Sequence, residues 1–310
     1  MATAAASRPA RRRRQALENP RVLATALIAP AVLYIALLVG GPLLLAGYLA
    51  FTNATAGSLR GDWVGLDNFA NQWHDPVFRD ALRNTFFFTI VSQVIVVAGA
   101  AFLAHFLIKD FRGKWFFRFL ILLPWAAPVA LSTLGWLWIF DSQFSVVNWA
   151  LSRLGVIGAY GSPDWPVWLG QPGLALFAVM FVNVWRGFPF SAIVLMAGLT
   201  SVPPEVIDAA KVDGATFMQR FRKVIVPMIA PILFIGSAFD TVFTLSDLSI
   251  VYLLTTGGPD SATEILPTLA YNTGIRAGAL GRGAAISLFL FPLLLPAMIL
   301  LLRTLRRRQY

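Results

Sequence analysis

The sequence contains no cysteine and only two histidines, His74 and His105, among its 310 residues. The absence of cysteine excludes disulfides, thiol chemistry and cysteine-ligated metals. The two histidines lie far apart in the sequence, without the spacing of metal ligands, and we find no catalytic constellation of the thiol, histidine or metal type. Charge is also scarce, since Asp, Glu, Lys and Arg make up 13% of the chain, against roughly a quarter in soluble domains.

Apolar residues take the place of the missing charge. Hydrophobic residues make up 57% of the chain, the mean hydropathy is +0.70, and there are ten Trp and 25 Phe. A surface this poor in charge faces lipid rather than water, and aromatic side chains anchor helices at the level of the lipid headgroups. We therefore predict an all-α membrane protein.

Six mostly apolar stretches are long enough to cross the hydrocarbon core as helices, which takes about 20 residues. Proline occurs in five of the six, which indicates a bundle of bent helices around a cavity. The predicted spans are 22–51, 84–108, 119–140, 172–199, 224–254 and 284–302. The first span precedes an extracytoplasmic loop at 52–83, and the other five form a core over 84–302 that contains a polar loop at 201–223.

Lysine and arginine are distributed unequally between the two sides that these spans define. Eighteen of the 25 lie in the basic tail 1–21 or after the second, fourth and sixth spans, including the basic tail 303–310. Six lie after the first, third and fifth spans, and Arg186 lies within a span. By the positive-inside rule, both termini and the loop 201–223 are cytoplasmic. Because the basic residues cluster between apolar runs, the net charge of +10 does not indicate nucleic-acid binding.

The loop 201–223 has the pattern of a short helix, a sharp turn and a second helix that leads into the fifth span. Pro203 and Pro204 suit the first turn of a helix, with Ser201 as its cap, and Gly214 ends it. The first helix has a small apolar face, and the second has an aromatic one; their residues are Val206, Ala209 and Ala210, then Phe217 and Phe221. Small residues permit close approach of another protein, so we favour a docking helix over a helix lying on the membrane, which would carry bulkier residues.

The same loop resembles the cytoplasmic signature of permease subunits in binding-protein-dependent ABC importers. That signature is E-A-A, three residues, G, nine residues, then I-x-L-P. Here it reads Asp208-Ala209-Ala210, three residues, Gly214, nine residues, then Val224-Ile225-Val226-Pro227. The spacing matches throughout, and the departures are Asp for Glu and Val for both Ile and Leu.

Other segments are similar to the carbohydrate-uptake branch of this family, of the maltose-permease type, and together they cover nearly the whole chain. They read Trp63-Val-Gly-Leu-Asp-Asn-Phe69, Leu82-Arg-Asn-Thr85, Val184-Trp-Arg-Gly-Phe-Pro-Phe190, Ala197-Gly-Leu199 before Val202-Pro203, and Thr255-Thr-Gly-Gly-Pro259. The single span before the core resembles the first of two related permeases. This implies a subunit of the bacterial inner membrane that pairs with a second permease, two ATPase subunits and an extracytoplasmic solute-binding protein.

The resemblance also implies how the loop works. The loop helix would sit in a groove on the ATPase, with Asp208 contacting a basic group there. Ala209 and Ala210 would allow close packing and Gly214 would make the turn, and Pro227, the last residue of the signature, belongs to the same ATPase-coupling set. ATP and Mg²⁺ would be bound by the ATPase subunits, so this chain has no cofactor and is not an enzyme. The side chain of Asp208 is one methylene shorter than the glutamate of the signature, which shortens its reach toward that basic group.

Polar residues within the spans are candidates for the solute pathway, because a lone charge in lipid is costly. Arg186 and Asp240 fall at similar depths in the fourth and fifth spans, so we hypothesise that they pair or face one cavity. A purely structural ion pair that joins two helices is the alternative. Weaker candidates, chosen because sugar sites combine aromatic faces with hydrogen-bonding groups, are Gln93, Asn183, Trp136, Trp138, Trp185 and Asp247.

Three other functions fit the sequence less well. A secondary transporter would need no docking loop and would typically show an internal repeat, which we do not find. A membrane-embedded enzyme would need a reactive constellation, and a channel would need repeated pore-lining segments. The sequence does not name the solute, so an ABC permease for a non-sugar solute also stays open.

Overall fold

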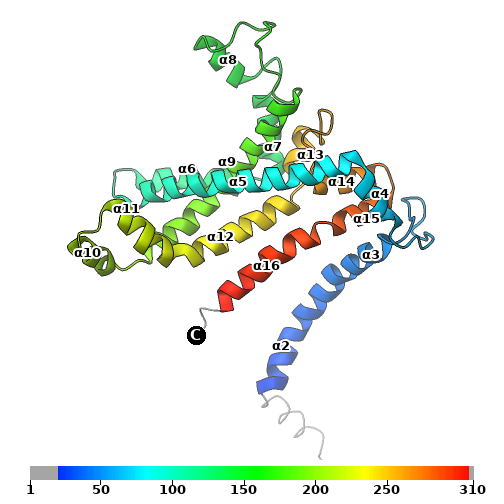
Figure 1. Ribbon diagram of the computed structural model, residues 1–310, viewed down its shortest axis with the longest axis horizontal. Coiled ribbons are helices and arrows are strands. Elements are labelled where there is room, and N and C mark those ends of the chain that lie inside the picture. Colours follow the sequence, from blue (N-terminus) through cyan, green and yellow to red (C-terminus); the bar gives the residue numbers. More distant parts are fainter. Residues whose placement is uncertain (1–19, 307–310) are drawn as a thin grey trace, which may run out of the picture.

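A computed structural model describes residues 20–306, and within that range it contains helices and connections but no strand beyond two isolated bridges, Thr52 with Trp63 and Thr55 with Ser58. The all-α prediction is therefore confirmed for the described residues. Figure 1 shows a bundle of long helices, with the connection around α10 and α11 at one end and that around α4 and α14 at the other. The tails predicted at 1–21 and 303–310 lie largely outside the described range.

Four helices in the described part of the chain are long and apolar enough to cross a membrane, and a bent pair makes a fifth. The four are Pro20–Leu49, Pro76–Ile108, Pro172–Thr200 and Phe217–Ser246, and the bent pair is Lys114–Ala126 with Val129–Ile139. The sixth predicted span falls on α15 (Leu280–Leu288) and α16 (Phe291–Arg306), where the apolar stretch Leu280–Pro296 is shorter than a full span. The structure thus supports four or five of the six expected spans.

Several predicted boundaries differ from the structure, since the third and fifth spans begin at Lys114 and Phe217, and two of the differences have a clear local cause. The second span begins as helix α5 at Pro76, ahead of residue 84, because Asp75 caps the helix by accepting a hydrogen bond from the backbone of Val77. The charged residues near the start of α5, namely Arg79, Asp80 and Arg83, hid the beginning of the helix from a count of apolar residues. The fifth span ends at Ser246, because Asp247 is extended, and the rest of the predicted stretch forms the separate helix α13 (Ser249–Leu254).

Proline explains the irregular points in the long helices. Helices α6 (Lys114–Ala126) and α7 (Val129–Ile139) meet at 96°, where Ala127 is extended before Pro128, as a residue before proline tends to be. The first span consists of α2 (Pro20–Ile35), the π-helical stretch η1 (Ala36–Gly40) and α3 (Gly41–Leu49). Stretch η1 ends just before Pro42, whose missing N–H removes one α-helical hydrogen bond.

A second π-helical stretch, nearer the loop 201–223, also lies just before a proline. It is η2 (Phe221–Ile225), which lies between α11 (Phe217–Arg220) and α12 (Val226–Ser246) and precedes Pro227. These three elements form one continuous helix.

Small side chains hold the centre of the bundle together. Helix α5 (Pro76–Ile108) lies along α9 (Pro172–Thr200), and Ala100, Ala104 and Ala192 are fully buried between them and α12. Alanine at such positions lets helix backbones approach closely, which is how helices associate in lipid. Helix α2, in contrast, has no buried residue, and Figure 1 shows it diverging from the bundle.

At the end of the bundle that holds α4 and α14, the connections link two of the segments whose sequences resemble carbohydrate-uptake permeases. The amide of Asn84 donates hydrogen bonds to the carbonyls of Ser261, Ala262 and Glu264, at 3.1–3.3 Å. The backbone N–H of Leu266 donates to Thr85 Oγ1 at 2.9 Å. The start of α5 is thereby fixed to the loop 255–265, which precedes α14 (Leu266–Tyr271) and the π-helical η3 (Asn272–Arg276).

Two further short helices complete the described chain. Helix α4 (Asp67–His74) follows the first span, and its Asn68 donates hydrogen bonds to the carbonyls of Ala50 and Thr52, which fixes the end of that span. Helix α8 (Val146–Arg153) lies in the segment between α7 and α9, which projects from the bundle in Figure 1.

Candidate functional site

The polar loop between α9 and α12 folds as the sequence predicts. It contains α10 (Pro204–Val212), Gly214 with φ of +74°, and α11, whose Thr216 and Gln219 form a reciprocal cap. The positive φ favours glycine, because an L side chain is strained in that conformation. The predicted cap Ser201 is wrong. Pro203 occupies the cap position, and the Ser201 hydroxyl donates to the carbonyl of Gly198 at 2.7 Å.

One face of the loop is anchored and the other is open. Val202 is buried and Ile207 packs against the cluster between α5, α9 and α12. Ala209 and Val206 are exposed, and Val212 is 88% exposed. An apolar surface that projects from an anchored loop is available for contact with another protein.

Among the described residues, Asp208, the acidic residue of the signature, pairs only with a neighbour in its own helix. Asp208 accepts a hydrogen bond from Lys211 at 2.7 Å, and both side chains are more than half exposed. An exposed ion pair of this kind contributes at most about 1 kcal/mol, so Asp208 is free to exchange partners. The rings of Phe217 and Phe221 stack with centroids 6.4 Å apart, which confirms that they share one face.

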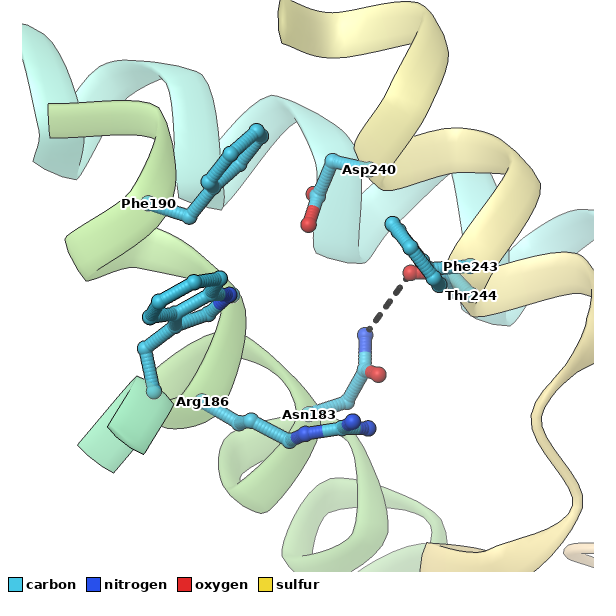
Figure 2. A pocket seen from close by; sticks show the side chains of 8 residues that line it. Asn183, Arg186, Phe190, Asp240, Phe243 and Thr244 are labelled. Atoms are coloured by element: carbon cyan, nitrogen blue, oxygen red, sulfur yellow. Dashed lines mark hydrogen bonds between the residues drawn. The ribbon is translucent and has the colours of Figure 1, made fainter. Parts of the chain in front are cut away.

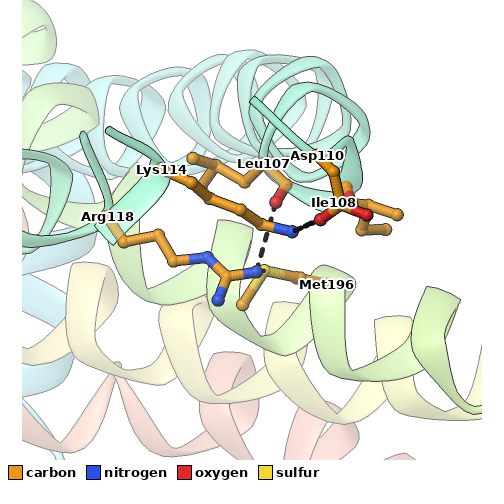
Figure 3. Close-up of polar contacts among 6 residues, drawn as sticks. All are labelled: Leu107, Ile108, Asp110, Lys114, Arg118 and Met196. Carbon is orange, nitrogen blue, oxygen red and sulfur yellow. Dashed lines mark hydrogen bonds and ion pairs between the residues drawn. The ribbon is translucent and has the colours of Figure 1, made fainter. Parts of the chain in front are cut away.

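Two basic side chains stabilise the neighbouring turn between α5 and α6 by hydrogen bonds (Figure 3). Lys114 Nζ donates to the carbonyl of Ile108 at 3.1 Å and to Asp110 at 3.0 Å, and Arg118 donates to the carbonyl of Leu107 at 3.2 Å. These groups satisfy carbonyls that the end of α5 leaves unpaired, and positive charge is favoured there. The basic cluster at 109–118 is therefore structural as well as a marker of orientation.

The candidate solute site is a cavity of about 110 Å³ between α6, α9 and α12. Figure 2 shows side chains of α9 and α12 facing one another across it. Its lining residues are Trp125 from α6, then Asn183, Arg186, Gly187 and Phe190 from α9, and Asp240, Phe243 and Thr244 from α12.

Arg186 forms a salt bridge with Asp247, at 2.5 Å between Nη1 and Oδ2, and not with Asp240. The hypothesised Arg186–Asp240 ion pair is therefore absent, although both side chains line the same cavity. Gly187 lies against Asp240, and Gly198 lies against Ile229, so α9 and α12 run antiparallel. Side chains lean toward the N-terminus of their own helix, which directs Arg186 toward the C-terminal end of α12, where Asp247 lies.

Asp240 remains without a salt bridge among the described residues. It is 8% exposed and lies against the backbone of α9, because a Cβ at Gly187 would be only 2.9 Å from its Oδ1. Figure 2 shows the Arg186 side chain extending past Asn183 and away from this carboxylate. The close approach requires glycine at position 187.

Some of the weaker candidates for the solute pathway lie in or beside the cavity, and others lie away from it. Asn183 donates to Thr244 at 3.4 Å in the cavity, and Thr241 donates to Gln93 at 3.4 Å beside it. Trp136 packs edge-on against Trp185, with centroids 5.3 Å apart, and belongs to the core cluster near α13. Trp138 is 69% exposed and outside the cavity lining.

Sequence reasoning missed five of the residues that line the cavity. Gly187 lies four positions after Asn183, Phe190 four after Arg186, and Phe243 and Thr244 three and four after Asp240, so helical spacing could have found them. Trp125 had no such signal, because it reaches Phe190, on which it stacks with ring centroids 5.9 Å apart, only through the packing of α6 on α9.

Glu264 is a buried carboxylate at the other end of the bundle that sequence reasoning also missed. It is 7% exposed, and Asn272 donates to both of its oxygens at 3.4 Å. Burial raises the pKa of Glu264 above its ordinary value, and hydrogen bonds from Thr268 and Asn272 offset part of that shift. A Cβ at Gly257, where φ is +97°, would lie 2.1 Å from the carboxylate, so this contact depends on glycine.

Comparison with known proteins gives the family. Residues 95–309 match the family described as binding-protein-dependent transport system inner membrane component. The chain is 29% identical over 292 residues to the sulfoquinovosyl glycerol transport system permease protein SmoG of Agrobacterium fabrum, covering 93% of this chain and 92% of that one. It is 34% identical over 249 residues to the trehalose/maltose transport system permease protein MalF of Thermococcus litoralis, covering 80% and 81%.

The fold agrees with these sequence matches. A chain in the crystal structure of a bacterial ABC transporter involved in the import of the acidic polysaccharide alginate superposes with a TM-score of 0.77 at 20% identity, over 96% of this chain and all of that one. The matched family covers more than half of the residues and ends beyond the loop and the cavity described above. The chain therefore belongs to the binding-protein-dependent transport system inner membrane components, the permease subunits of ABC importers.

Proposed function

We propose that this permease forms, with a second permease, the membrane path of an ATP-driven importer for a sugar or a related solute. The relatives named above serve sulfoquinovosyl glycerol and trehalose or maltose, which supports a glycoside as the solute. The cavity supports the same class, because it combines aromatic faces at Trp125 and Phe190 with the polar groups of Asn183, Asp240 and Thr244. Sites for small molecules typically place a few polar groups among apolar walls in this way.

We further propose six spans with both termini in the cytoplasm. The excess of Lys and Arg after the even-numbered spans supports this orientation. It places the loop 201–223 on the cytoplasmic side and Glu264 on the extracytoplasmic side, where the solute-binding protein of such a system delivers its ligand.

The second permease is needed to cover surfaces that this chain leaves open. Helix α2 has no buried residue, and its apolar side chains are exposed all along its length. A helix that crosses beside the bundle without packing on it is suited to contact another subunit in the membrane.

The observation that carries the proposal is the continuous helix 217–246, which begins at the cytoplasmic loop and reaches the cavity at Asp240 and Thr244. A movement of the loop is transmitted to the cavity along this helix. In our proposal the ATPase binds the surface of α10, with Asp208 at its edge and Ala209 and Ala210 in contact. Gly214 holds the angle between α10 and α11, and Pro227 begins the rigid part of the helix.

ATP binding by the partner subunits then shifts the bundle between two arrangements that open the cavity to opposite sides. ATP and Mg²⁺ are bound by those subunits. This chain supplies the path and the mechanical link.

Affinity purification of the chain from its native membrane, with mass spectrometry of the associated proteins, tests the proposal. We expect a second permease, an ATPase and a solute-binding protein. Recovery of the chain alone, in a preparation that keeps a known membrane complex intact, would contradict the docking role of α10 and favour a secondary transporter.

A further inference from the structure

The charged groups of the cavity show which solutes it accepts. Among the described residues that line it, Arg186 is the only cation. Its guanidinium is held by Asp247, whose side chain is 21% exposed, while that of Arg186 is 28% exposed. The positive charge is therefore already neutralised within the protein.

The remaining charged group is acidic. Asp240 lines the cavity, is 8% exposed, and makes no salt bridge with any described residue. If it is ionised, its carboxylate repels an anion. If it is protonated, it offers no counter-charge. Neither form stabilises an anionic solute, and bringing such a solute out of water without a cation is costly.

We infer that this cavity selects uncharged saccharides and rejects those that carry phosphate, sulfonate or carboxylate groups. The inference rests on the proposed function and narrows it to a substrate class. Asp240, Asn183 and Thr244 are specificity-determining residues that hydrogen-bond hydroxyl groups, while Trp125 and Phe190 contact the apolar faces of sugar rings. Asp247 is a positioning residue that keeps Arg186 away from the solute.

The absence of native cysteine allows the charge of the cavity to be measured without knowing the solute. Phe243 lines the cavity and is 63% exposed, so a Phe243→Cys variant in the purified complex presents one thiol of this subunit to reagents. We would compare its reaction rates with an anionic sulfonatoethyl and a cationic trimethylammonioethyl methanethiosulfonate, each divided by the rate with a free thiol.

We expect the corrected rate for the cationic reagent to equal or exceed that for the anionic one. Adding Asp247→Asn should free Arg186 and shift the ratio by roughly tenfold toward the anionic reagent, as expected when a unit charge loses its partner. Adding Asp240→Asn should shift the ratio in the same direction by a smaller factor when the carboxylate is ionised, and should leave the ratio unchanged when it is protonated. A cavity that reacts faster with the anionic reagent before either substitution would overturn the inference.

Two controls separate electrostatics from damage to the fold. A Leu59→Cys thiol, at an exposed position outside the cavity, should show the same reagent ratio with and without Asp247→Asn. Each variant should co-purify with its partners at the level of the parent. If Asp247→Asn does not assemble, the ratios for the parent and for Asp240→Asn still decide the outcome.

An uptake assay distinguishes a failure of this inference from a failure of the proposed function. Cells lacking the chain, and the same cells complemented with it, would be given trehalose, maltose and diacetylchitobiose together with trehalose 6-phosphate, sulfoquinovosyl glycerol and alginate oligosaccharides. Restored depletion of an uncharged member supports the inference, and restored depletion of an anionic member overturns it. If no member is restored, the proposed sugar import itself is contradicted, while the reagent ratios still report the charge of the cavity.

Discussion

At the scale of single residues, the partner of Arg186 depends on the direction in which side chains lean. Asp240 lies within α12 and Asp247 directly follows its last residue, about two helical turns further along, and depth alone favoured Asp240. The antiparallel packing of α9 and α12 brings Asp247 within reach instead. A sequence gives the depth of a charge within a span, but not the relative rotation and direction of neighbouring helices, so the cavity was predictable and the pairing was not.

Exchanging the charges tests this pairing. Arg186→Asp or Asp247→Arg alone leaves one partly buried charge without a partner, which costs on the order of 2 kcal/mol after allowance for solvent screening. We expect the double variant Arg186→Asp with Asp247→Arg to recover at least part of the lost thermal stability of the complex. The matched exchange of Arg186 with Asp240 should recover none, and equal recovery in both exchanges would argue against the observed pair.

A second residue-scale prediction concerns pH. Because burial raises the pKa of Glu264, its protonated form is favoured in the folded protein. The stability that it contributes is complete below the ordinary Glu value of 4.5 and is lost as pH rises from there through the raised value. Glu264→Gln keeps the hydrogen-bonding shape but cannot ionise. Between pH 4 and 7, the melting temperature of the complex should therefore fall less steeply with rising pH for this variant than for the parent.

The exposed Glu205 on α10 provides the matched control. Glu205→Gln should leave the pH dependence of the melting temperature unchanged. A Glu264→Gln variant that follows the parent curve at every pH would show that the buried carboxylate does not titrate in this range.

At the scale of elements, most helices were predictable because their apolar runs are long and their boundaries carry proline or glycine. The helix 172–200 and the loop with α10, Gly214 and α11 follow the sequence closely. The right-angled bend at Ala127 and the break at Asp247 were not located, because proline marks where a helix is weakened and not how far it turns.

The exposed face of α10 gives a prediction at this scale. Ala209→Leu places a bulky side chain on the small surface proposed to contact the ATPase, and we expect ATP-driven uptake to fall at least tenfold while the amount of this subunit in the membrane is unchanged. The same substitution at an exposed alanine outside the loop 201–223, Ala56→Leu, should have little effect. Equal uptake by the Ala209→Leu variant and the parent would place the ATPase contact elsewhere.

At the scale of the whole molecule, the described helices leave open the surfaces that we propose a second permease covers. The cavity is bounded by only three helices, and α2 packs on none of the core. In lipid, a helix gains no hydrophobic energy from burial against another, so such an arrangement persists through specific packing with a partner. A sequence shows that α2 is long and apolar, but the fact that none of its described residues is buried appears only once the other helices are placed.

This arrangement predicts a labelling pattern along the first span. Single cysteines at successive positions of α2, from 22 to 35, would be treated with a lipid-soluble maleimide, in the assembled complex and in the isolated chain. If α2 packs against the second permease, labelling in the complex should rise and fall with a period of about 3.6 residues, because one face is covered. In the isolated chain, whose described α2 residues are all exposed, labelling should be nearly uniform. Uniform labelling in both preparations would mean that α2 contacts lipid on every side and that the second permease binds elsewhere on the bundle.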